Sequence, residues 1–179
     1  MSAVPAAPAS GSAGLEPLSV LAARVGAILR ERRETVAVVE SSAGGLVSAA
    51  LLAIPGASAF FLGGAVVYSR RAGKALLGLT PDDMTGMRAE TEPYARFVAG
   101  RIRDSHRATW GIAESGAAGP SGSPYGDASG HVCVAVAGAV TASRTIETGD
   151  TDRASNMDVF ARQLLQLFEE TLRTQATAA

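Results

Sequence analysis

The sequence predicts an α/β protein: a single three-layer α/β/α domain built around a mixed β-sheet. Short apolar runs rich in β-branched residues, typical of buried strands, alternate with longer segments whose apolar residues recur at helical spacing. The chain has 179 residues, which suits one domain of roughly 100–200 residues. Hydrophobic residues make up 47% and aromatic residues 5% of the chain, so the core must consist mainly of Ala, Val and Leu.

The N-terminal part predicts a tail, a helix and a strand. Residues 1–14 are mainly Ala, Pro, Ser and Gly, a composition typical of disorder, so we expect the folded domain to occupy 15–175. In 15–34, apolar residues recur at helical spacing and charges cluster at the C-terminal end, where cations suit the helix dipole. The β-branched run 35–39 predicts a buried strand.

Helices and strands then alternate toward the middle of the chain. The Ala- and Leu-rich segment 43–53 predicts a helix that ends before a Pro-Gly pair. Residues 63–69 predict a second strand, and 70–78 predict a short helix that its final glycine closes. Thr80 and Pro81 favour a further helix start, as cap and first-turn residue.

The C-terminal half predicts the remaining elements and one long loop. Residues 90–105 predict a helix, and 109–115 predict a third strand. The loop 116–130 is dense in Gly, Pro and Ser, and a loop of this length in a compact domain is often functional. Two strands within 131–149 predict a hairpin, and a last helix covers about 153–173.

Composition excludes several classes of protein. A formal net charge of −1 gives no reason to expect a nucleic-acid partner, which favours a concentrated basic face. Cys133 is the only cysteine, so no internal disulfide is possible and a reducing compartment fits. No signal peptide and no apolar run of about 20 residues is present, which predicts a cytoplasmic protein without membrane contact. The two histidines and one cysteine have no zinc spacing, so we expect neither metal nor cofactor.

The corner after the first strand is the first candidate site. Glu40, Ser41 and Ser42 follow the apolar run, and Gly44 and Gly45 precede the next helix. A hydroxyl above a helix N-terminus can hold a phosphate or stabilise an oxyanion, and glycines let a ligand approach the backbone. The same serines could instead serve only as helix caps.

Four stretches, taken together, resemble the CinA C-terminal domain family, whose known activity is nicotinamide mononucleotide amidase. The resemblance covers roughly 18–172, and family patterns such as E-S-C-T-G-G, Y-S-N and T-G-I-A-G-P have counterparts here. The stretches are "ESSAGG" (40–45), "PGASAFFLGGAVVYS" (55–69), "LLG" (76–78) and "SGAAGPSG" (115–122).

The resemblance implies a fold, a reaction and a set of residues. It implies an α/β/α domain that often dimerises, and a serine that attacks the carboxamide of the nicotinamide ring so that ammonia leaves. The nucleophile falls on Ser41, the family's tyrosine on Tyr68, and Lys74 is the candidate assisting base. The implied substrate-binding residues are Glu40, Ser42, Gly44, Gly45, Ser115, Gly116, Gly119 and Arg153.

The position of the base departs from the family pattern. The family activates its serine with a lysine five residues after the tyrosine, and here that position is Gly73, with Lys74 one residue later. One residue on a helix turns a side chain by about 100°. Three alternatives stay open: Lys74 reaches Ser41 through local distortion, another base acts, or the chain is a nucleotide-binding protein without catalysis.

Other residues of the C-terminal half complete the candidate set. His131 is a conceivable substitute base, although we favour a surface histidine at a strand edge. Tyr125 and Asp127 are additions to the long loop that could redefine the ligand. Cys133 lies in an apolar strand and is expected to be a small core residue. The basic stretch "SRR" (69–71), which follows Tyr68, could meet a phosphate.

Overall fold

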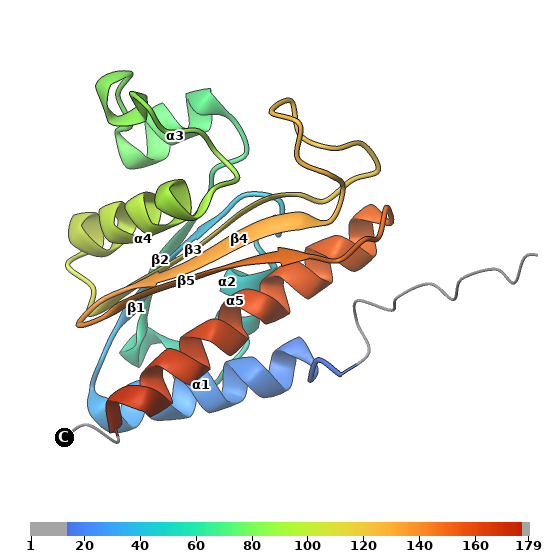
Figure 1. The fold of residues 1–179 in the computed structure, drawn as a ribbon. Coiled ribbons are helices and arrows are strands. Elements are labelled where there is room, and N and C mark those ends of the chain that lie inside the picture. Colours follow the sequence, from blue (N-terminus) through green and yellow to red (C-terminus); the bar gives the residue numbers. More distant parts are fainter. Residues whose placement is uncertain (1–13, 177–179) are drawn as a thin grey trace, which may run out of the picture.

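A computed structural model describes residues 14–176, so the predicted tail lies almost entirely outside the described residues. Within these residues, five helices, two 3₁₀ turns and five strands alternate in sequence order (Figure 1). In order they are α1 Leu18–Arg32, β1 Val36–Glu40, α2 Leu46–Leu52, the turn η1 Ala57–Ala59, β2 Phe61–Val66, α3 Arg70–Leu77, the turn η2 Asp82–Met84, α4 Glu92–His106, β3 Trp110–Ala117, β4 His131–Ala137, β5 Thr141–Glu147 and α5 Arg153–Ala176.

The strands form one mixed sheet in the order β2-β1-β3-β4-β5. β1 pairs in parallel with β2 and β3, whereas β3, β4 and β5 pair antiparallel. The two parallel pairings need the long helical crossovers through α2 and through α3 and α4. The predicted hairpin is confirmed as β4 and β5, and the mixed sheet is confirmed with it.

Helices cover both faces of this sheet, which confirms the three-layer prediction (Figure 1). α1, α2 and α5 pack on one face, against side chains such as Val38, Ile112 and Val134. α4 packs on the other face, against Ala37, Ala113 and the rest of the alternate positions. The strand positions on the second face are mostly Ala.

Several element boundaries differ from the predicted ones. α2 begins at Leu46 rather than 43, because the five residues 41–45 form a turn between β1 and the helix. The second strand begins at Phe61, two residues before the predicted start. The predicted helix start at Thr80 gives only the single turn η2, and Pro81 rather than Thr80 precedes it. No helix in the part of the chain that the structure describes is long and apolar enough to cross a membrane.

The contact between α4 and β3 depends on a glycine, and a second glycine close by provides a control for testing it. A Cβ at Gly111 would lie 1.9 Å from the carbonyl oxygen of Ala99, a backbone atom that cannot move aside. Gly100, the next residue on α4, has nothing within 4 Å of the place that a Cβ would take.

We therefore expect opposite effects from alanine at these two glycines. Gly111→Ala should destabilise the protein by about 3 kcal/mol, the upper end of the usual cost of overpacking, whereas Gly100→Ala should stabilise it by up to about 1 kcal/mol through helix propensity. Urea unfolding of both variants measures this difference. Equal stability of the two variants would contradict the described packing of α4 on β3.

The sheet topology places a crevice at the carboxyl ends of its parallel strands. From β1 the chain leaves toward β2, and from β3 it leaves toward β4, so the connections diverge between the neighbouring strands β1 and β3. Ligands of open α/β sheets bind at such a switch point. Ser41 follows β1, Tyr68 follows β2 closely, and Ser115 lies near the end of β3.

Candidate functional site

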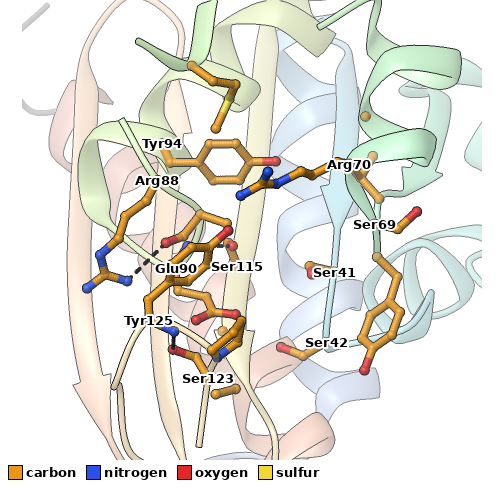
Figure 2. Close-up of a pocket in the computed structure, with 18 of the residues that line it drawn as sticks. Ser41, Ser42, Ser69, Arg70, Arg88, Glu90, Tyr94, Ser115, Ser123 and Tyr125 are labelled. Atoms are coloured by element: carbon orange, nitrogen blue, oxygen red, sulfur yellow. Dashed lines mark hydrogen bonds between the residues drawn. The ribbon is translucent and has the colours of Figure 1, made fainter. Parts of the chain in front are cut away.

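A cavity of about 750 Å³ opens at this edge of the sheet. Its walls come from the ends of β1, β2 and β3, from α3, from the segment before α4 and from the long loop 118–130 (Figure 2). The volume suits a ligand of nucleotide size. Of the predicted site residues, the cavity is lined by Ser41, Ser42, Tyr68, Lys74, Ser115, Gly116, Gly119 and Arg153.

A buried carboxylate on the neighbouring strand β3 binds the turn that carries Ser41. Glu114, on β3, accepts hydrogen bonds from the backbone N–H of Ser41 (2.9 Å) and of Ala43 (2.8 Å) through Oε2. The hydroxyl of Ser42 donates to its Oε1. Burial raises the pKa of Glu114, and these three donors act against that rise. Glu114 therefore fixes the backbone that presents the Ser41 hydroxyl.

Glu40 occupies the helix N-terminus that was expected to receive an anion. Its Oε2 accepts the N–H groups of Gly45 (2.9 Å) and Val47 (3.0 Å), and its Oε1 accepts the N–H and hydroxyl of Ser48 at 2.8 and 2.7 Å. Glu40 is fully buried and does not line the cavity.

The amide of Gly45 is therefore not free for a phosphate. Gly44 and Gly45 also lie outside the cavity lining, and both take left-handed backbone angles within the turn. Glu40, Gly44 and Gly45 therefore stabilise the turn and do not line the cavity. The sequence-based expectation of an anion site at this helix N-terminus does not fit this geometry.

Tyr68 and Arg153 meet on one wall of the cavity although 85 residues separate them. The guanidinium of Arg153 donates to the Tyr68 hydroxyl (3.1 Å) and lies over the tyrosine ring, 5.8 Å from its centroid. It also donates to the carbonyl oxygen of Gly119 (2.7 Å). Because Tyr68 is 65% exposed, this pair forms an accessible rim that joins the start of α5 to β2 and the long loop.

Ser115 lies at the floor beside Ser41 and is 2% exposed. Its hydroxyl accepts the backbone N–H of Glu90 at 3.1 Å. A Cβ at Gly116 would lie 2.4 Å from the carbonyl oxygen of His131, so the β3–β4 contact requires glycine there. These contacts tie the floor of the cavity to the segment before α4.

Lys74 lines the cavity but does not contact Ser41. Within residues 14–176, neither the Lys74 ammonium nor the Ser41 hydroxyl has a hydrogen-bond partner. Gly73, at the family's lysine position, is buried and also lines the cavity. Its missing side chain would lie between Leu79 and Val67, with Cβ 3.1 Å from Leu79 Cδ1.

Positive charge surrounds the opening of the cavity. Besides Lys74 and Arg153, the lining includes Arg70 and Arg88. The Arg70 side chain extends to the hydroxyl of Tyr125 across the cavity (Figure 2). Four cations converge on one cavity, which is suited to an anionic ligand such as a phosphate ester.

The long loop is fastened by a charged cluster next to the cavity. Arg88 binds Asp127 through two hydrogen bonds of 2.6 and 2.9 Å, and the Ser123 hydroxyl donates to Asp127 at 2.7 Å. Arg88 is the largest cause of the lowered pKa of Asp127. The guanidinium of Arg88 also lies 5.3 Å from the centroid of the Tyr125 ring. Asp127 therefore positions the loop that carries Tyr125.

His131 is buried, so the expectation of a surface histidine is wrong. Its Nδ1 lies 2.5 Å from Glu147 Oε1 across the hairpin, and its Nε2 lies 2.9 Å from the carbonyl oxygen of Glu90. Burial works to lower the pKa of His131, but Glu147 and the Glu90 carbonyl outweigh it and raise that pKa. His131 does not line the cavity. Cys133 is buried in the core, as predicted.

Sequence reasoning missed Glu114, Arg88 and Glu90. An acid within the apolar strand "WGIAES" is a signal for Glu114, because a buried carboxylate in a strand needs donors. Arg88 and Glu90 lie in a segment whose sequence carries no comparable signal. Both reach the cavity only because α4 packs over the sheet.

The fold and the site define an α/β protein with a nucleotide-sized cationic cavity and a serine on a tight turn at its floor. The family model for the CinA C-terminal domain matches residues 18–172. The chain belongs to the CinA C-terminal domain family.

Relatives and solved structures agree with this assignment. A CinA-like protein of Prochlorococcus marinus (strain MIT 9313) is 46% identical over 62% of this chain and 26% of its own length. One from Anaeromyxobacter sp. (strain Fw109-5) is 38% identical over 82% of this chain and 37% of its own length. The chain thus spans between about a quarter and somewhat more than a third of the length of these relatives.

Solved structures of similar proteins have about the same length as the matched domain. A competence or damage-inducible protein from Enterobacter asburiae superposes with a TM-score of 0.81 at 29% identity, covering 88% of this chain and 99% of that one. The competence damage-inducible protein A from Klebsiella pneumoniae gives a TM-score of 0.82 at 26% identity, with 88% and 98% coverage.

Proposed function

We propose that this protein is an amidohydrolase that deamidates nicotinamide mononucleotide, or a related pyridine nucleotide, with Ser41 as nucleophile. The observation that carries the proposal is the position of Ser41: a half-buried hydroxyl without a hydrogen-bond partner among the described residues, on the floor of a cavity lined by four cations. The cations would bind the ligand's phosphate and leave the pyridine carboxamide at the serine.

The remaining residues of the cavity have roles in the same reaction. Ser41 attacks the carboxamide carbon, the C–N bond breaks, and ammonia leaves with a proton; water then releases the acid from the ester. Lys74, which lines the same cavity without a hydrogen bond to Ser41, is the candidate for accepting the serine proton. Tyr68, Arg153 and Ser115 orient the substrate along the walls.

Ammonia release from nicotinamide mononucleotide tests this function. The wild-type protein is expected to form ammonia and nicotinic acid mononucleotide in equal amounts, which chromatography of the nucleotide and an enzymatic ammonia assay measure together. Calorimetry with the same nucleotide shows whether the cavity binds it. Binding without any ammonia would exclude the hydrolytic function.

A second function, ligand binding without catalysis, is favoured by one specific observation. The position of the family's lysine is Gly73, and no basic side chain of the described residues hydrogen-bonds the Ser41 hydroxyl. A serine without a base is a poor nucleophile. The cavity and its cations would then serve to bind a phosphorylated ligand.

Gly73→Lys separates these two functions. If only the base is missing, this variant should release ammonia at least about tenfold faster than the wild type, because general-base assistance contributes about 10²–10⁴-fold. Gly73→Met is the matched control, since it places a similar chain against Leu79 without an amine. Rates of both variants equal to the wild-type rate, with both proteins folded, would show that position 73 does not limit the reaction.

A further inference from the structure

Glu90 is the only acidic residue among the described residues that line the cavity. Its side chain lies among Arg88, Ser115, Ser123 and Tyr125 (Figure 2). The other charged side chains that line the cavity are cations, so Glu90 is the source of negative charge on one part of the wall. A ligand that fills the cavity meets positive charge at its anionic end and a carboxyl group elsewhere.

The backbone of Glu90 is held in an unusual conformation. Its φ of 63° lies in the left-handed region, which a non-glycine residue adopts only when its surroundings enforce it. The Ser115 hydroxyl accepts its N–H at 3.1 Å, and His131 Nε2 lies 2.9 Å from its carbonyl oxygen. Strain that the structure maintains in this way is typical of functional positions. These contacts fix the position of the backbone from which the Glu90 side chain extends.

One oxygen of the carboxyl group lacks a donor among the described residues, although the Ser123 hydroxyl interacts with the group and works to lower its pKa. Glu90 Oε2 is buried and has no hydrogen-bond partner in the described part of the chain. The neighbouring guanidinium of Arg88 donates hydrogen bonds to both oxygens of Asp127 rather than to the Glu90 carboxyl group. Burial, and then the nearby carboxylate of Asp127, raise the pKa of Glu90. An N–H donor from a ligand would supply the missing partner.

We propose that the Glu90 carboxyl group selects ligands that present an N–H donor and excludes ligands that present a carboxylate at the same place. This inference rests on the proposed function, because it assumes that the reacting carboxamide lies at Ser41. Ser115, whose hydroxyl binds the Glu90 backbone, lies on β3 directly beside the strand that ends at Ser41. The carboxamide nitrogen would therefore lie toward Glu90.

The consequence is discrimination between substrate and product. Nicotinamide mononucleotide offers two N–H bonds at the carboxamide, whereas nicotinic acid mononucleotide offers a carboxylate there. A buried carboxylate oxygen that lacks a donor favours the first, and like-charge repulsion disfavours the second. The same group would promote release of the product after the reaction.

Calorimetry in a Ser41→Ala background measures this discrimination without turnover. We expect the parent variant to bind nicotinamide mononucleotide at least tenfold more tightly than nicotinic acid mononucleotide. Adding Glu90→Gln should bring the two affinities within about threefold, because glutamine can donate to a carboxylate. Glu90→Asn is a second variant, since Asn tolerates a left-handed backbone. Glu92→Gln is the control, because Glu92 bonds Ser143 and Thr145 outside the cavity.

The outcomes separate this proposal from the amidase function. Preserved discrimination in folded Glu90→Gln and Glu90→Asn proteins, or no preference in the parent, would overturn the role of Glu90 even if the wild type releases ammonia. Discrimination that these variants remove supports that role even if the wild type is inactive. Binding of neither nucleotide to the parent would overturn the proposed ligand class and the role of Glu90 with it.

Discussion

Ser41→Ala is expected to lower the rate of ammonia release from nicotinamide mononucleotide by at least about 10³-fold, as loss of a serine nucleophile does. The hydroxyl is the only group removed, and it has no hydrogen-bond partner among residues 14–176. The Kd for the nucleotide should therefore change by less than about threefold, and the free energy of unfolding should change by less than about 0.5 kcal/mol.

The neighbouring serine provides the control for this result. The Ser42 hydroxyl is bound to Glu114 and is 3% exposed. Ser42→Ala should cost about 1 kcal/mol of stability through the lost hydrogen bond and reduce the rate by far less than Ser41→Ala. If the two variants lost activity equally, the nucleophile would not be Ser41 alone.

Glu114→Ala is expected to lower both the free energy of unfolding and the reaction rate. The substitution leaves three buried donors without an acceptor: the N–H groups of Ser41 and Ala43 and the hydroxyl of Ser42. Because each such donor costs about 1–3 kcal/mol, we expect a loss of about 3–5 kcal/mol in the free energy of unfolding, measured in urea. Misplacement of Ser41 by about 1 Å should lower the rate by about 10²-fold.

Glu114→Gln distinguishes hydrogen bonding from charge at this position. The glutamine oxygen can accept the two backbone N–H groups while its amide donates to the Ser42 hydroxyl. Since burial raises the pKa of Glu114, a neutral group suits the site, and we expect a loss of less than about 1.5 kcal/mol. Glu170→Ala, at an exposed ion pair with Arg144, should cost at most about 1 kcal/mol. A Glu114→Ala protein as stable as the Glu170→Ala protein would contradict the described support of the turn.

The hydrophobic pattern of the sequence predicted most of the fold, because most of its helices and strands follow from local periodicity. The β-branched runs that became β1 and β4 are buried on both sides, and α1 and α5 show clear helical spacing. Errors fell where a distant group decides the local structure. α2 begins only where the Glu40 carboxylate can reach its first N–H groups, and that reach depends on the turn between them.

The site could be predicted in part. Ser41, Tyr68 and Ser115 all follow or end parallel strands, so a sheet topology brings them together. Glu90 lines the cavity because α4 packs over the sheet and the Ser115 hydroxyl binds its backbone N–H. The residues next to Glu90 in the sequence predict neither contact. His131 is buried because Glu147 lies opposite it in the hairpin register.

Partitioning of the reaction with hydroxylamine tests the central claim, attack by Ser41 on a carboxamide, most directly. An ester at Ser41 would react with hydroxylamine as well as with water, so wild-type protein should form nicotinohydroxamic acid mononucleotide in proportion to the hydroxylamine concentration, and Ser41→Ala should form none. Release of ammonia from nicotinamide mononucleotide without any hydroxamate, or hydroxamate formation that persists in Ser41→Ala, would contradict the claim.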